Sequence, residues 1–213
     1  MARRVDIDTW PRAGQYRLFR SFANPHFAIT APLDVTRLMA ELKPRGVSPF
    51  TAVLYALTAG ANAVPEFLTR FRGEEVVIHE AAGTSFTVPA NDSGFVFCEA
   101  PWHADWTDFD RECRACIDAA RRGGGHKGEA TEGQDEWLFM SCLPWLDFSA
   151  MTHPVGGPQD CIPRIAWGRI TRRADGRHLT PVAVQVHHAL VDGEHVGAFF
   201  AAAQDALGRI EAG

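Results

Sequence analysis

Two adjacent histidines near the carboxyl end, His187 and His188, are the residues whose type and spacing point most directly to chemistry. Asp192 and Gly193 follow them, so that His188 opens the pattern His-x-x-x-Asp-Gly. The ordinary pKa of histidine lies near neutral pH, and a well-positioned imidazole can therefore accept a proton from a hydroxyl group. A lone histidine beside an apolar strand is more often a structural residue, but this spacing favours a general base.

A strand and a helix flank this pair and must position it. Apolar residues alternate before the histidines, which predicts a half-buried strand (Val182, Val184 and Val186). After Gly193, apolar residues recur at helical spacing (Val196, Phe199, Phe200, Ala203, Leu207 and Ile210). The histidines therefore fall where a strand ends and the chain turns into a helix, at an edge of a sheet that a reactant can reach.

The composition is that of one globular domain covering residues 1–213, with 46% hydrophobic and 22% charged residues. A net charge of −5 argues against a nucleic acid or an anionic membrane as partner. The chain shows no signal-peptide pattern and no apolar run of the ~20 residues that a membrane span needs. Five cysteines, an odd number, indicate reduced thiols and a cytoplasmic protein. Cys113 and Cys116 stand at helical spacing, which favours packing in the core over a metal or redox centre, and we expect no metal.

The rest of the chain alternates between strand and helix patterns without a repeat or a linker. Helices are predicted from Asp34 to Gly46, from Ser48 to Pro65, and over residues 105–121. A mobile surface loop is expected at 121–136. The predicted strands are one containing Phe27, Ile29 and Ala31, then 74–80, 85–88, 94–99 and 137–142, and a hairpin of 162–171 with 178–186.

The stretch HHALVDGEHVGAFF, residues 187–200, resembles the active-site signature of the chloramphenicol acetyltransferases. A shorter form of this signature also marks dihydrolipoamide acyltransferases and the condensation domains of peptide synthetases. Other motifs of the chloramphenicol family follow in its order over nearly the whole chain: Trp10-x-Arg12-x-x-x-Tyr16, the segment 64–80, Phe86-Thr87-Val88, and Ser141-Cys142-Leu143-Pro144-Trp145. Several modest motifs in one order are more specific than any one of them alone.

The resemblance implies an α/β fold, a two-layer sandwich in which helices cover a mixed β-sheet. It also implies a homotrimer with active sites between subunits, and transfer of an acetyl group from acetyl-CoA to a hydroxyl group. Chloramphenicol is the best single candidate for the acceptor. The alternatives are a different alcohol or a thiol, as in the dihydrolipoamide acyltransferases, and a ligand-binding relative without catalysis.

The resemblance assigns roles to individual residues. His188 is the general base, with its ring held by its own backbone carbonyl. In a catalytic triad Asp192 would orient His188, whereas the family pattern pairs Asp192 with Arg12. Ser141 stabilises the oxyanion, and Trp145 forms a wall of the CoA site. For Phe19 and Phe27 two interpretations stay open, an apolar acceptor pocket or the aromatic core. For His187 we expect a structural role, as for most histidines beside an apolar strand.

The sequence also departs from the family pattern in both binding pockets. Ala166 stands where the family has a threonine near the oxyanion, and Phe19 replaces a tyrosine of the chloramphenicol pocket. Ile170 replaces a tyrosine of the CoA site. The expected catalytic residues are thus retained while the residues that select the substrates differ.

Overall fold

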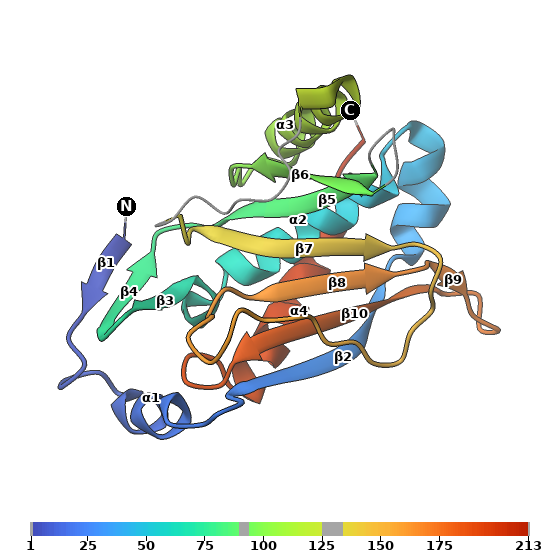
Figure 1. Cartoon of the computed structure of the whole chain (residues 1–213). Helices are drawn as coiled ribbons and strands as arrows, with labels where there is room; N and C mark the ends of the chain where they lie inside the picture. The colour runs from blue at the N-terminus through green and yellow to red at the C-terminus, as the bar shows by residue number, and fades with distance from the viewer. Residues whose placement is uncertain (1, 90–93, 125–133, 213) are drawn as a thin grey trace.

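A mixed β-sheet forms the centre of the molecule in the computed structural model, which describes residues 2–89, 94–124 and 134–212 (Figure 1). Its strands follow the order β2-β10-β8-β7-β5-β6, and β9 pairs with β10. The β5–β7 and β7–β8 pairs are parallel and the others are antiparallel, so the prediction of a mixed sheet is confirmed. The strands span His26–Asp34 (β2), Gly83–Pro89 (β5), Phe95–Ala100 (β6), Trp137–Leu143 (β7), Arg164–Gly168 (β8), Thr171–Arg172 (β9) and His178–His187 (β10).

Helices cover one face of this sheet. Helices α2 (Pro49–Asn62) and α4 (Gly193–Arg209) pack behind it, and α3 (Trp106–Ala119) lies beside β6 (Figure 1). The helix predicted from Ser48 to Pro65 is present as α2, and it is buried on nearly every side between the sheet and its helical neighbours. Gly60 permits this close packing, since a Cβ atom there would lie 2.8 Å from the Phe199 carbonyl oxygen.

The helix predicted from Asp34 to Gly46 consists of short irregular turns rather than one α-helix. A π-helical segment (η1, Leu38–Leu42) leads into a 3-10 turn (η2, Lys43–Arg45). The Asp34 carboxylate accepts a hydrogen bond from the Thr36 amide (2.8 Å), as expected of a residue that starts a helix. Gly46 ends the segment with a φ of 93°, a conformation that favours glycine.

A second, three-stranded sheet of order β1-β4-β3 lies beside the main sheet (Figure 1). Only β4 (Glu75–His79) was predicted from the sequence; β1 (Ala2–Val5), β3 (Thr69–Arg72) and helix α1 (Ala13–Arg20) were not. Between α2 and β3 the chain forms a 3-10 turn, η3 (Pro65–Leu68), and a π-type turn, η4 (Ala120–Gly124), follows α3. The loop expected at 121–136 lies mostly outside the described residues.

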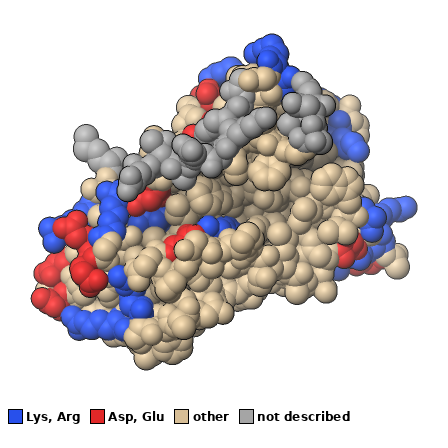
Figure 2. Space-filling model, viewed as in Figure 1, with Lys and Arg blue, Asp and Glu red and all other residues tan. Residues whose placement is uncertain are grey.

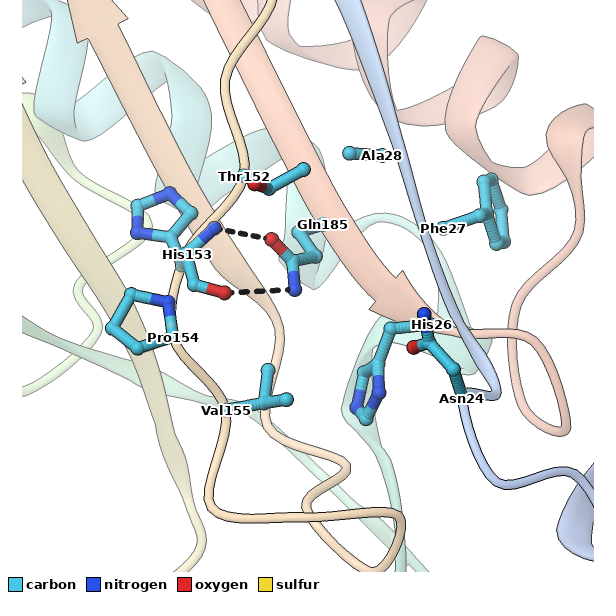
Figure 3. Close-up of a pocket in the computed structure, with 9 residues that line it drawn as sticks. All are labelled: Asn24, His26, Phe27, Ala28, Thr152, His153, Pro154, Val155 and Gln185. Atoms are coloured by element: carbon cyan, nitrogen blue, oxygen red, sulfur yellow. Dashed lines mark hydrogen bonds between the residues drawn. The ribbon is translucent and has the colours of Figure 1, made fainter.

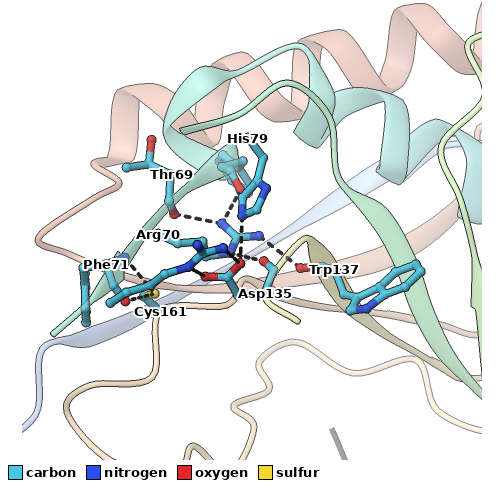
Figure 4. A network of polar contacts seen from close by, with 9 residues as sticks. Thr69, Arg70, Phe71, His79, Asp135, Trp137 and Cys161 are labelled. Carbon is cyan, nitrogen blue, oxygen red and sulfur yellow. Dashed lines mark hydrogen bonds and ion pairs between the residues drawn. The ribbon is translucent and has the colours of Figure 1, made fainter. Parts of the chain in front are cut away.

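A buried arginine joins the small sheet to the start of β7 (Figure 4). Arg70 is fully buried and donates hydrogen bonds to the carbonyl oxygens of Phe67, Thr69, Asp135 and Trp137. These four acceptors offset the cost of removing the guanidinium from water.

The carboxylate of Asp135 extends this network toward the surface. Its Oδ1 accepts a hydrogen bond from Arg72 Nη2 at 2.6 Å and lies 2.9 Å from His79 Nε2. Burial would raise the pKa of Asp135, but the hydrogen bonds and charges of Arg72 and His79 outweigh it and hold the pKa below its usual range.

The cysteines of α3, Cys113 and Cys116, pack in or against the hydrophobic core. Cys113 is buried, and burial raises the pKa of its thiol, which keeps it protonated and unreactive. The predicted packing role of this residue is confirmed. Within the described parts of the chain, no helix is both long enough and apolar enough to span a membrane.

No helix of the described residues packs on the other face of the sheet (Figure 1). The connection between β7 and β8, residues 144–163, runs across this face beside β10 and β2 (Figure 1). Charged side chains gather at the left, the right and the top of the view, and the middle carries few (Figure 2). This face holds the ladder neighbours Ala183, Ala166 and Ser141, which point away from the helices.

Candidate active site

His188 lies in the turn between the end of β10 and the start of α4, as the sequence predicts. Its backbone amide donates to the Pro25 carbonyl oxygen (2.9 Å), which fixes the turn against the chain before β2. About a third of its side chain, 35%, is exposed, so the ring is held by the protein and remains accessible.

Arg12 holds this turn from the other end of the chain. Its side chain is 10% exposed, and its Nε donates to the Ala189 carbonyl oxygen at 3.1 Å. Its Nη2 donates to the His188 carbonyl oxygen at 3.0 Å and to Asp192 Oδ1 at 2.6 Å, while Nη1 donates to Asp192 Oδ2. The predicted pair of Arg12 and Asp192 is therefore present and bidentate.

Asp192 contacts the histidine as well as the arginine. Its Oδ1 lies 3.1 Å from His188 Nδ1, so both the family pairing and the triad contact are present in one carboxylate. The hydrogen bond with Arg12 lowers the pKa of Asp192 most, burial opposes it, and the nearby charges of Arg12, His188 and His195 lower it further. The carboxylate is therefore ionised at neutral pH.

The ring of His188 is oriented differently from the expectation. Its Nδ1 lies 3.1 Å from the Val191 carbonyl oxygen and not on its own carbonyl, which Arg12 occupies. The carbonyl and the Asp192 carboxylate are both acceptors, so Nδ1 carries the hydrogen. Among the described residues, Nε2 has no hydrogen-bond partner. Its lone pair is therefore available to accept a proton.

Two aromatic rings fix the plane of this imidazole. Phe19 stacks on His188 with ring centroids 3.9 Å apart and an interplanar angle of 11°. Phe27 approaches with a centroid distance of 4.6 Å and a tilt of 49°. These two predicted pocket residues therefore touch the predicted base, and they restrict its rotation.

His187, in contrast, is enclosed by protein. It is 1% exposed, its Nδ1 accepts from the Ala189 amide (3.1 Å), and its Nε2 faces the Pro158 carbonyl oxygen (3.0 Å). These partners require the neutral ring with its hydrogen on Nε2. Burial lowers the pKa of His187 to about 4. Its surroundings agree with the predicted structural role.

Ser141 and Trp145 do not join His188 within one chain. Ser141 is opposite Ala166 on β8, which is opposite Ala183 on β10, five residues before His188. Two strand spacings and five residue rises put Ser141 and His188 roughly 15–20 Å apart. Trp145 follows β7 and is 69% exposed.

A pocket of about 330 Å³ lies between the start of β2 and the loop 152–155 (Figure 3). Gln185 fixes this loop, since its Oε1 accepts from the His153 amide (2.5 Å) and its Nε2 donates to the His153 carbonyl oxygen (3.2 Å). The Phe27 ring points away from Gln185 and His153 (Figure 3). The pocket and the imidazole therefore lie on different sides of this lining residue.

Two residues near the turn that carries His188, Gln185 and His195, make contacts that the sequence did not reveal. His195 Nδ1 accepts a hydrogen bond from the Asp192 amide (2.9 Å). The Asp-x-x-His spacing at the start of a predicted helix was the available signal, but glutamate or glutamine is usual at that position.

The fold places this chain among proteins built on a mixed sheet covered by helices. A solved dihydrolipoamide acetyltransferase of Azotobacter vinelandii superposes with a TM-score of 0.64 at 16% identity, over 92% of this chain and 86% of that one. The core of a pyruvate dehydrogenase multienzyme complex gives the same TM-score at 18% identity, with the same coverage. At these identities the likeness shows a shared fold and no more.

Closer similarity identifies the family. The chloramphenicol acetyltransferase family profile matches residues 2–204. A chloramphenicol acetyltransferase 2 of Escherichia coli is 28% identical, over 92% of each chain, and a chloramphenicol acetyltransferase of Proteus mirabilis is 27% identical, over 91% of this chain and 88% of that one. A solved chloramphenicol acetyltransferase superposes with a TM-score of 0.89 at 28% identity, over 97% of this chain and all of that one. The chain belongs to the chloramphenicol acetyltransferase family, a family of acyltransferases.

We predict that Asp192→Asn lowers both stability and activity. The substitution leaves the buried Arg12 guanidinium without its counter-charge, and we expect a loss of about 2–4 kcal/mol because Asp192 is itself partly exposed. Urea unfolding measures the change. Asp175→Asn, which breaks the exposed pair with Arg177, is the matched control and should leave the unfolding midpoint unchanged. Equal midpoints for Asp192→Asn and the wild type would contradict the structural role of the pair.

Stability should fall with acidity because of His187. The unfolded histidine binds a proton near pH 6.5 and the folded one only near pH 4, so the unfolded state holds more protons in between. The contribution of His187 is complete above pH 6.5 and is lost as the pH falls toward 4, with a slope of about 1.4 kcal/mol per pH unit. Unfolding at a series of pH values, compared with His187→Gln, measures this slope; parallel curves would refute it.

Proposed function

We propose that this protein transfers the acetyl group of acetyl-CoA to a hydroxyl group of a small molecule, with His188 as general base and chloramphenicol as the best single acceptor. The observation that carries the proposal is the state of one imidazole. Nδ1 of His188 is held by two acceptors, and Nε2 is accessible and unpaired among the described residues. An imidazole in this tautomer is suited to take a proton from an alcohol.

In the proposed reaction, His188 carries one proton from the acceptor hydroxyl to the sulfur of CoA. His188 Nε2 accepts the hydroxyl proton as the acceptor oxygen attacks the thioester carbon. The oxyanion that forms then collapses, the carbon–sulfur bond breaks, and CoA leaves as a thiolate. The protonated His188 returns the proton to that sulfur, which yields free CoA and an acetyl ester. Asp192, with its negative charge beside Nδ1, favours the transient imidazolium.

The oxyanion donor in this proposal is Ser141 of a neighbouring copy. Within one chain the sheet separates Ser141 from His188, so a complete site of these two residues requires a second copy. The family resemblance implies a homotrimer that supplies it. Among the described residues, the sheet face that carries Ser141 has no helix packed on it, and the middle of this side of the molecule shows few charged side chains (Figure 2), which suits burial between copies.

The proposal also assigns the residues that contact the acceptor and CoA. Phe19 and Phe27 provide an apolar surface around the reacting hydroxyl, and Trp145 provides a flat exposed wall for CoA. Phe19 lacks the hydroxyl group of the family tyrosine in the chloramphenicol pocket, so the acceptor can be an alcohol other than chloramphenicol, or a thiol. Ile170 lacks the hydroxyl group of the family tyrosine in the CoA site. All five cysteines are free, in keeping with the proposed cytoplasmic location.

Release of free CoA thiol tests the function. Purified protein is incubated with acetyl-CoA and a panel of alcohols and thiols that includes chloramphenicol, and the released thiol is followed with a colorimetric reagent. We expect thiol release that depends on the acceptor, and its loss in His188→Gln. Release with another acceptor alone would select the alternative substrate. A ligand that binds tightly without any release would favour a non-catalytic relative.

Mixing two inactive variants tests the shared site. Ser141→Ala should lower kcat by about 10²–10³ with little change in substrate binding, because it removes one oxyanion donor. His188→Gln should be inactive. In trimers assembled from both variants, about a quarter of the sites would combine an intact Ser141 with an intact His188. Recovery of activity on co-refolding supports the shared site. Mixed trimers without recovery would contradict it, as would a monomeric wild type in light scattering.

A further inference from the structure

The first turn of α4 contains a capping arrangement that reaches the catalytic turn. Asp192 is the N-cap of the helix and His195 is the N3 residue of a capping box. Nδ1 of His195 accepts the hydrogen bond of the Asp192 amide at 2.9 Å. The backbone of Asp192 is thereby fixed by one histidine while its side chain contacts another, His188. A displacement of this backbone would move the carboxylate away from the His188 ring.

A carboxylate on the far side of His195 fits the same arrangement. Glu66, on the 3-10 turn η3, lies with its Oε1 3.5 Å from His195 Nε2. An acceptor on that side favours a hydrogen on Nε2 and leaves Nδ1 bare. Only in this tautomer can Nδ1 accept from the Asp192 amide. His195 and Glu66 are largely covered, with 22% and 31% of their side chains exposed.

We propose that His195, oriented by Glu66, is a positioning residue for the acetyl transfer: it fixes the Asp192 backbone and so keeps the hydrogen of His188 on Nδ1 and its Nε2 free. Neither residue touches the reacting atoms. The role rests on the proposed function of His188 as base, and it adds a third chain segment, η3, to the segments of Arg12 and His188 that define the site.

Substitutions at His195 separate positioning from packing. His195→Ala removes the acceptor and should lower kcat by roughly 5- to 30-fold, the effect of losing a helix cap, with KM nearly unchanged. His195→Gln places the usual capping-box partner at N3 and should restore kcat to within about threefold of the wild type. If the alanine variant unfolds, His195→Phe keeps a ring without an acceptor and should show the same loss. Equal loss in the Gln and Phe variants would overturn the proposal.

A double-mutant cycle isolates Glu66. Glu66→Ala should lower kcat in the wild type, because the His195 ring then populates both neutral tautomers. The same change should have no further effect in His195→Gln, since an amide needs no tautomer to be selected. Effects that multiply independently in the double variant would overturn the part assigned to Glu66.

The tautomer of the His188 ring can be measured without turnover, so it tests this inference independently of the proposed function. Nitrogen-15 NMR of labelled histidine rings, with the His188 signals assigned by their loss in His188→Gln, reports which nitrogen carries the hydrogen. The neutral His188 ring should be protonated on Nδ1 in the wild type and in His195→Gln, and should be mixed in His195→Phe. If no acceptor releases thiol, the proposed function fails while this measurement still decides the positioning. An unchanged His188 tautomer in His195→Phe would refute it.

Discussion

The contact between Arg12 and Asp192 is the constraint on which the site depends. It joins residues 180 positions apart, and one guanidinium also holds the carbonyl oxygens of His188 and Ala189. A lysine has three donors on one atom and could not engage a carboxylate and two carbonyls on different sides. The arginine is nearly buried, which is costly unless its donors are used, and here Nε, Nη1 and Nη2 all have partners. The same bonds that offset this cost fix the backbone around the imidazole.

The sharing of Asp192 between Arg12 and His188 has a chemical consequence. One carboxylate holds the guanidinium that fixes the backbone of the turn and also lies beside Nδ1 of the ring. The Val191 carbonyl oxygen lies at the same distance from Nδ1, 3.1 Å. These two acceptors fix the direction of the ring, with its hydrogen on Nδ1, and Phe19 fixes its plane.

Local signals made part of this structure predictable from the sequence. The alternating valines of β10, the Ser48-Pro49 start of α2 and the helical spacing after Gly193 each depend on neighbouring residues only. The missed elements lack such signals. β1 reads Ala-Arg-Arg-Val at a sheet edge, and β3 reads Thr-Arg-Phe-Arg with Arg70 fully buried, which contradicts every pattern of polar residues facing water. The burial of Arg70 depends on four carbonyl groups that converge on its guanidinium, and two of them, those of Asp135 and Trp137, come from a distant segment.

The candidate site was also predictable only in part, where a local motif or the family resemblance gave a signal. The motif and the family resemblance predicted His188, Asp192 and Arg12, and the structure brings these three together. The partners that set the His188 tautomer could not be predicted in this way, because the choice between its own carbonyl, that of Val191 and the Asp192 carboxylate depends on turn geometry. His195 and Glu66 are 129 residues apart in sequence and meet only once α4 packs against the segment that follows α2.

The β-ladder sets a limit that no side-chain movement can change. Ser141, Ala166 and Ala183 occupy one row across β7, β8 and β10, and each further residue toward His188 adds about 3.3 Å along the strand. A serine side chain reaches only about 2.4 Å from its Cα atom, so a change of rotamer leaves the gap to the imidazole almost unaltered. The two residues can therefore act on one carbonyl group only if two copies of the chain face each other. The proposed mechanism therefore makes activity depend on assembly. A surface substitution far from either residue that displaces one copy by an ångström would separate the proposed base from the proposed oxyanion donor.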